Sequence, residues 1–275
     1  MKNIRFTKLE GGGNDFILVD NRGVRGGKTG WDERSIKLCA RKTGIGADGV
    51  LLLQDHRNSD FMMRIFNSDG SEAEMCGNGA RCAAYYYYLE TNKKKVKFIT
   101  LAGIMKSSIK PGGVVNLLLP APTGTELNRL INIEGKQMSV SFINTGVPHA
   151  VVETSRLEEI DVKKTGRQIR YNEAFAPAGT NVNFVTVKAP GLLEIRTYER
   201  GVEDETLACG TGVTASAIIS ALKEKTSLPV RVKTRGGLVM TVYGNISASD
   251  DLLSRVNDVR LEGHVSKVFS GETEV

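Results

Sequence analysis

The chain has 275 residues, of which 40% are hydrophobic and 25% charged, a composition typical of a globular protein with a substantial core. No stretch reaches the roughly 18 consecutive apolar residues of a membrane span, and the N-terminus has no apolar signal segment, so we expect a cytoplasmic protein with no membrane partner. The net charge of +6 is dispersed, and the one basic run, Lys93 to Lys95, has no interleaved aromatic residues, which argues against a nucleic-acid partner.

The first half of the chain is predicted to consist mainly of strands. After Cys76, the Ala-rich stretch ARCAAYYYYLE is apolar on nearly all sides and predicts a buried helix. A second helix is expected over Asp32 to Arg41. Alternating apolar residues indicate strands at NIRFTKL, DFILVD, VLLLQ and FMMRIF.

The second half repeats the first in the same order, at a constant offset of 133 residues. Its strands are expected at VNFVTV and LLEIRTY, and its helix at VTASAIISALKEK. Each half is therefore predicted to pack several strands around one central helix. The Pro- and Gly-rich segment Leu119 to Leu127 interrupts the periodicity and predicts the boundary between domains 1–119 and 120–263. The matched blocks are GGNDFILVD with TGVPHAVVE, GADGVLLL with GTNVNFVTV, MCGNGA with ACGTGV, and the segments around Gly103 and Gly236.

The two repeated cysteines, Cys76 and Cys209, each follow a strand and a loop and precede a helix. Unpaired amides and the helix dipole favour an anion at this position, which predicts a lowered thiol pKa and a binding place for a substrate carboxylate. If the halves face each other across a cleft, one thiolate can remove an α-proton while the opposite thiol returns a proton to the other face. This scheme needs no cofactor and no metal. Cys39 and Cys82 lie inside helical patterns and are expected to be buried.

The motifs GGNDF, GIGADG, FNSDGSEAEMCGNGARC, ERGVEDETLACGTG and LEGHV resemble the diaminopimelate epimerase family across nearly the whole chain. The resemblance implies an isomerase that converts LL-2,6-diaminopimelate to the meso isomer in lysine and peptidoglycan-precursor biosynthesis, without pyridoxal phosphate or metal. It also implies an α+β fold of two pseudo-symmetric domains, each of mixed β-strands wrapped around a central α-helix, with the active site in the cleft between them. Residues 264–275 would return to the N-terminal domain, and the enzyme would be a homodimer.

The resemblance also assigns site residues. Cys76 and Cys209 are the implied catalytic pair, with His149 and Glu199 helping to manage the thiol protons. Val147 and Gly49 depart from the family pattern, which has asparagine and glutamine in some members at these places, so we expect fewer groups around the distal end of the substrate. The implied substrate-binding residues are Asn14, Asn67, Gly77, Asn78, Asn181, Glu199, Arg200, Gly210 and Thr211.

Three other functions compete with this one. The chain could be a racemase of another amino acid on the same scaffold, although Arg200 favours a substrate with a charged distal end. It could be a thiol redox or metal-binding protein, but the cysteine spacing suits neither. A basic nucleic-acid binder is the remaining alternative.

Overall fold

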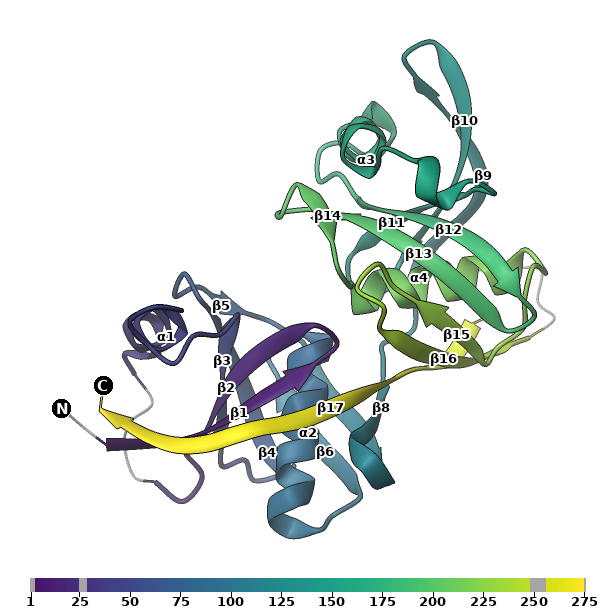
Figure 1. Cartoon of the computed structure of the whole chain (residues 1–275). Helices are drawn as coiled ribbons and strands as arrows, with labels where there is room; N and C mark the ends of the chain where they lie inside the picture. The colour runs from purple at the N-terminus through teal and green to yellow at the C-terminus, as the bar shows by residue number, and fades with distance from the viewer. Residues whose placement is uncertain (1–2, 25–28, 248–255, 275) are drawn as a thin grey trace. The chain divides into compact units, whose positions relative to one another are not determined.

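The computed structural model describes residues 3–24, 29–247 and 256–274. Contacts divide the chain into two compact units: unit 1 is Met1–Leu117 with Gly263–Val275, and unit 2 is Leu118–Glu262. The predicted α+β class is confirmed, because each unit packs mixed strands against a central helix of its own, α2 or α4 (Figure 1).

Unit 1 contains every strand that alternation predicted in the first half of the chain. The helix predicted over Asp32 to Arg41 is α1, which ends slightly earlier. The elements are β1 (Asn3–Gly11), β2 (Asn14–Asp20), α1 (Trp31–Cys39), β3 (Gly49–Gln54), β4 (Phe61–Asn67), β5 (Glu72–Ala73), α2 (Gly77–Thr91), β6 (Lys95–Thr100), β7 (Gly103–Lys110), η1 (Pro111–Gly113) and β8 (Val114–Leu118).

Unit 2 adds elements that the sequence patterns did not predict, among them α3 and the hairpin of β9 and β10. The segment Leu119 to Leu127, where the apolar periodicity is interrupted, is partly β-strand, since β9 begins at Thr123. Gly124, at φ 61, lies inside β9 where its pairing with β10 shifts register, and glycine is common at such irregularities. The elements are β9 (Thr123–Ile133), β10 (Lys136–Asn144), β11 (Pro148–Glu153), η2 (Leu157–Glu159), α3 (Val162–Arg170), η3 (Glu173–Phe175), β12 (Asn181–Ala189), β13 (Leu192–Glu199), β14 (Asp204–Thr206), α4 (Gly210–Leu222), β15 (Val230–Lys233), β16 (Val239–Ile246) and β17 (Val256–Glu274), whose second part belongs to unit 1.

The sequence repeat is also a repeat of strand topology. In unit 1, β1–β2, β3–β4 and β6–β7 are antiparallel, while β2–β3 and β4–β6 are parallel. Unit 2 has the same alternation in β10–β11, β12–β13 and β15–β16, with β11–β12 and β13–β15 parallel. Since the order and direction of five successive pairings agree, the two halves are copies of one supersecondary unit.

The central helices are held by equivalent strands. Helix α2 contacts β1 to β4, β6 and β7, and α4 contacts β10 to β13, β15 and β16. All residues of α4 from Gly212 to Leu222 are buried, whereas α2 is buried through Ala84 and only half-buried along its tyrosines. This packing fixes the axis of each helix, and with it the direction of the amides in its first turn.

Candidate active site

Cys76 and Cys209 occupy the same position in their units, the N-cap of the central helix. Their backbone angles nearly coincide, with φ −139 and ψ 121 at Cys76 and φ −136 and ψ 110 at Cys209. The amide of Gly79 donates to the Cys76 sulfur at 3.5 Å. The first amides of an α-helix have no partner within the helix, so each cysteine lies beside donors suited to a carboxylate.

The Cys209 thiol differs from the sequence-based expectation. The pKa of Cys209 is raised to about 11, first by burial and then by the nearby Glu199 carboxylate, and the Thr211 hydroxyl and the amides of Gly212 and Thr211 oppose this rise. The Thr211 Oγ1 lies 3.3 Å from the Cys209 sulfur. The predicted lowering of the thiol pKa is therefore wrong for Cys209, because desolvation outweighs the helix amides. Near neutral pH this cysteine holds its proton.

Glu199→Gln is expected to make Cys209 react faster with an alkylating reagent at pH 8. The substitution removes the negative charge that raises the Cys209 pKa, so a larger fraction is thiolate at a given pH. The pH dependence of iodoacetamide labelling, followed by peptide mass spectrometry, measures this shift. Labelling of Cys76 in the same samples is the internal reference. An unchanged or slower reaction at Cys209 would show that the Glu199 carboxylate does not raise the Cys209 pKa.

The other predicted site residues of unit 2 influence this thiol or one another. His149 is fully buried on β11, and burial together with Arg200 lowers the pKa of His149 to about 3, so the imidazole is neutral. Glu199, at the end of β13, is half-buried, and burial raises the pKa of its carboxyl group, an effect that the Thr206 hydroxyl opposes. We call His149, Asn181, Glu199, Arg200 and Cys209, with Gly210 and Thr211 of the first helical turn, the Cys209 group.

Asn181 and Arg200 are oriented by main-chain contacts. The Asn181 side chain accepts a hydrogen bond from the Arg200 amide at 2.9 Å and donates to the Pro148 carbonyl at 3.0 Å. The Arg200 guanidinium donates to the Ala178 carbonyl at 3.2 Å through one nitrogen. Its planar fork has five N–H donors in total, so donors remain for a carboxylate.

In unit 1, Asn14 and Asn78 contact each other. The Asn78 side chain donates to Asn14 Oδ1 at 2.7 Å, and the fully buried Arg81 donates to Asn78 Oδ1 at 2.6 Å. Asn14 in turn donates to Asp48 at 3.0 Å. A line of buried or half-buried groups thus fixes both asparagines beside Gly77 and Cys76.

Asn67 stands apart from this line. It is exposed at the end of β4, and its side chain donates to Ser71 at 3.0 Å. We call Asn14, Asn67, Cys76, Gly77 and Asn78 the Cys76 group.

The two groups differ in the polarity of their surroundings. At the offset of 133 residues, His149 and Glu199 correspond to Phe16 and Phe66, whereas Arg81 corresponds to Thr214. The Cys76 group therefore has a buried cation behind it, and the Cys209 group has a carboxyl group and an imidazole. Three further residues at these groups, Arg81, Asp48 and Asn183, were not predicted from the sequence. A comparison of the two halves position by position gives the missing signal, since Asn183 replaces Val50 in a buried strand.

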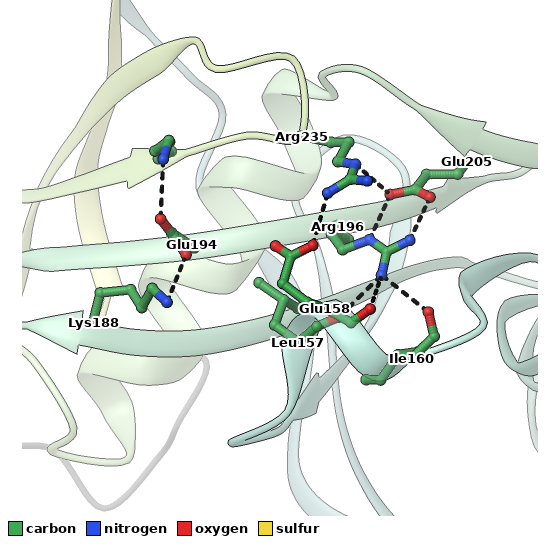
Figure 2. A network of polar contacts seen from close by, with 9 residues as sticks. Leu157, Glu158, Ile160, Lys188, Glu194, Arg196, Glu205 and Arg235 are labelled. Atoms are coloured by element: carbon green, nitrogen blue, oxygen red, sulfur yellow. Dashed lines mark hydrogen bonds and ion pairs between the residues drawn. The ribbon is translucent and has the colours of Figure 1, made fainter.

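An arginine and a glutamate join the two strands that precede each cysteine. Arg196 on β13 binds both oxygens of Glu205 on β14 at 2.7 Å and donates to the carbonyls of Leu157 and Ile160 at 3.0 Å (Figure 2). In unit 1, Arg64 on β4 binds Glu72 on β5 in the same bidentate manner, at 2.6 and 2.7 Å. These pairs fix the short strand from which the chain enters each cysteine loop.

Arg196→Met is expected to lower the free energy of unfolding by about 3 kcal/mol, because it removes the donor from a poorly solvated carboxylate and from three carbonyls. Arg235→Gln is the matched control. Arg235 also binds a glutamate in this network, at 2.8 Å, but its side chain is 46% exposed, so we expect a loss below about 1 kcal/mol. Urea denaturation followed by circular dichroism measures the free energy of unfolding of both variants. Equal losses would show that the buried Arg196 pair contributes no more to stability than the exposed Arg235 pair.

Two kinds of feature are absent from residues 3–24, 29–247 and 256–274. No helix in them is long and apolar enough to cross a bilayer. They contain no group of three or more His, Cys, Asp or Glu side chains arranged to hold a metal ion.

Comparison with known proteins identifies the family. The diaminopimelate epimerase family model matches residues 6–117 and 141–249. The chain is 45% identical to the diaminopimelate epimerase of Aquifex aeolicus, over 98% of this chain and 97% of that protein. It is 42% identical to that of Hydrogenobaculum, over 96% of each.

Solved structures share the fold at low sequence identity. A phenazine biosynthesis protein of the PhzF family from Bacillus anthracis superposes with a TM-score of 0.72 at 16% identity, over 100% of both chains. A probable proline racemase from Agrobacterium radiobacter gives 0.69 at 16% identity, over 99% of this chain and 92% of that one. These likenesses concern the fold, whereas the family model and the full-length relatives decide membership. The chain therefore belongs to the diaminopimelate epimerase family.

Proposed function

We propose that Cys76 and Cys209 are the acid–base pair with which this chain epimerises LL-2,6-diaminopimelate to the meso isomer. The reaction itself follows from family membership and is a step of lysine biosynthesis. The observation that carries the assignment of the pair is their equivalence. Each cysteine is the N-cap of a central helix, in nearly the same backbone conformation, beside first-turn amides that have no partner within the helix.

In the proposed reaction, one sulfur removes the α-proton and the other donates a proton to the opposite face of the same carbon. The amides of Gly77, Asn78, Gly210 and Thr211, with the Thr211 hydroxyl, bind the α-carboxylate and stabilise the charge that develops on it. The protonated state of Cys209 suits it to act as the acid when Cys76 is the base. Glu199 then serves as the neighbouring group that accepts the Cys209 proton when the direction is reversed, and the raised pKa of its carboxyl makes it a better acceptor.

The distal end of the substrate carries a second ammonium and a second carboxylate. We propose that Arg200 binds the distal carboxylate, with Asn14, Asn67 and Asn181 pairing with the remaining polar groups. Asn67 and Arg200 occupy equivalent positions at the offset of 133 residues, which places one such residue at the end of β4 and the other just after β13. The substrate is thus held by both copies of the repeat.

No external cofactor enters this scheme. The purified protein should convert LL-diaminopimelate to the meso isomer in the presence of a metal chelator and without added pyridoxal phosphate, as measured by chromatography of the isomers. Activity that appears only after a cofactor or metal is added would contradict the proposal. We further propose that the enzyme is a homodimer in the cytoplasm. Light scattering in solution should then give twice the chain mass of 29.9 kDa.

A further inference from the structure

Three buried side chains on neighbouring strands of unit 2 form a polar chain that ends on His149. Thr197, Asn183 and His149 lie on β13, β12 and β11, and all are at most 2% exposed. The Thr197 hydroxyl donates to Asn183 Oδ1 at 3.0 Å. The Asn183 amide nitrogen lies 3.2 Å from the Ala150 carbonyl and 3.0 Å from His149 Nδ1.

The Ala150 carbonyl determines the direction of the whole chain. A carbonyl oxygen only accepts hydrogen bonds, so the Asn183 atom beside it must be the amide nitrogen, which donates. The second hydrogen of that nitrogen then points to His149, and His149 Nδ1 must accept it. A neutral imidazole carries one proton, so in His149 the proton is on Nε2.

The surroundings disfavour the charged form of this imidazole. His149 is fully buried, and Arg200, the charged group that acts on it, is a cation. Asn183 offers it a donor and no negative charge. The Nε2–H group is buried and makes no hydrogen bond to any residue in the described ranges, and such a donor is costly unless another group accepts from it.

Asn183 also touches the turn that carries the catalytic sulfur. A Cβ placed on Gly212 would lie 2.3 Å from Asn183 Oδ1, so only glycine fits against this side chain. The Gly212 amide in turn lowers the pKa of the Cys209 thiol. In unit 1, Val50 corresponds to Asn183 and Phe16 corresponds to His149, and both are apolar. The polar chain is therefore a feature of the Cys209 copy of the repeat.

We propose that Asn183 is a positioning residue that holds His149 in the Nε2–H tautomer, so that the imidazole takes part in the reaction as a hydrogen-bond donor and not as a base. The inference rests on the proposed function, in which Cys209 is catalytic, and assigns the part of His149 in it. A donor of this kind stabilises negative charge on the sulfur or on a bound carboxylate, without exchanging its own proton.

Nuclear magnetic resonance of the ring nitrogens tests the tautomer directly. The chain has only three histidines, His56, His149 and His264, so a protein labelled with ¹⁵N-histidine can be assigned with His56→Gln and His264→Gln. For His149 we expect a protonated Nε2 and an unprotonated Nδ1 throughout the range from pH 8 down to pH 5. A protonated Nδ1, or an imidazolium near neutral pH, would overturn the proposal.

Asn183→Asp tests the positioning part. The new carboxylate cannot donate to Nδ1 and instead attracts a proton there, so His149 should acquire an Nδ1–H group and titrate nearer neutral pH. We expect kcat/KM to fall at least roughly tenfold, with a new ionisation in the pH–rate profile. A changed tautomer with an unchanged kcat/KM and pH profile would overturn the functional part.

Thr197→Val is the matched control for damage to a buried polar chain. It removes one hydrogen bond, but the Ala150 carbonyl still orients Asn183, so the tautomer should remain that of the wild type and the loss of activity should be smaller. Asn116→Asp, at a buried asparagine on β8, controls for the burial of a carboxylate elsewhere. Identical spectra and equal losses in Asn183→Asp and Thr197→Val would overturn the proposal.

These measurements separate the two proposals. The nitrogen spectra are recorded without substrate and do not depend on which residues are catalytic. If Cys209 proved dispensable while His149 kept the Nε2–H tautomer, the proposed function would fail and the structural part of this inference would stand. If both cysteines proved essential but His149 carried its proton on Nδ1, the proposed function would stand and this inference would fail.

Discussion

Replacing either Cys76 or Cys209 with alanine is expected to reduce epimerisation at least a hundredfold. Each direction of the reaction needs one sulfur as base and the other as acid, and a positioned acid or base contributes roughly 10²–10⁴ to the rate. Because the two act as one unit, the double variant should be little worse than either single variant. Initial rates from both isomers, measured on folded protein, give the numbers.

Cys39→Ala is the control for this pair. Cys39 is buried at the end of α1 and does not cap either central helix, so it is predicted to have no part in proton transfer. Its variant should keep turnover within a few-fold of the wild type. Near-normal turnover in Cys76→Ala or Cys209→Ala would show that the repeated cysteines are not the acid–base pair.

The second large effect concerns the distal end of the substrate. Lysine, which lacks the distal carboxylate, should have a kcat/KM roughly 10⁴ lower than that of diaminopimelate, because a site built to bind a polar group discriminates strongly against an analogue without it. The physical cause is Arg200, whose guanidinium keeps donors that its contact with Ala178 does not use.

Arg200→Met supplies the comparison that ties this discrimination to one side chain. The variant should lose most of its activity on diaminopimelate, while the low activity on lysine changes little, so the ratio between the two substrates narrows. Competitive rates with both amino acids, followed by chromatography of the isomers, measure that ratio. Comparable kcat/KM values for the two substrates in the wild type would favour a broad amino-acid racemase.

Local patterns in the sequence were sufficient for much of the fold. Alternating apolar residues predicted the strands around Ile17 and Leu52, and the Ala-rich stretch after Cys76 predicted the buried helix α2. The constant offset between the halves predicted equivalent places for the cysteines, and both are N-caps of central helices. These features depend on residues near one another in the chain, or on a direct comparison of repeats.

Other features depend on contacts that no local pattern contains. The high pKa of Cys209 comes from burial and from Glu199, which belongs to a different element. In the sequence, Asn183 is a single polar residue within a predicted strand. Its contacts with Ala150 and His149 on the neighbouring strand arise only in the fold. The ion pair of Arg196 with Glu205 joins two strands across a turn and, in the sequence, resembles any exposed pair of charges.

The most direct test of the two-cysteine account follows deuterium during the first part of the reaction. LL-Diaminopimelate with protium at its α-carbons is incubated with the enzyme in deuterated water, without cofactor. The isotope content of substrate and product is measured at low conversion. In deuterated water the donating sulfur carries a deuteron from the solvent. The account therefore predicts meso product with one α-deuterium, while the remaining substrate keeps its protium. Product that retains the protium of the substrate would show that one group both removes and returns the proton, and would contradict the account.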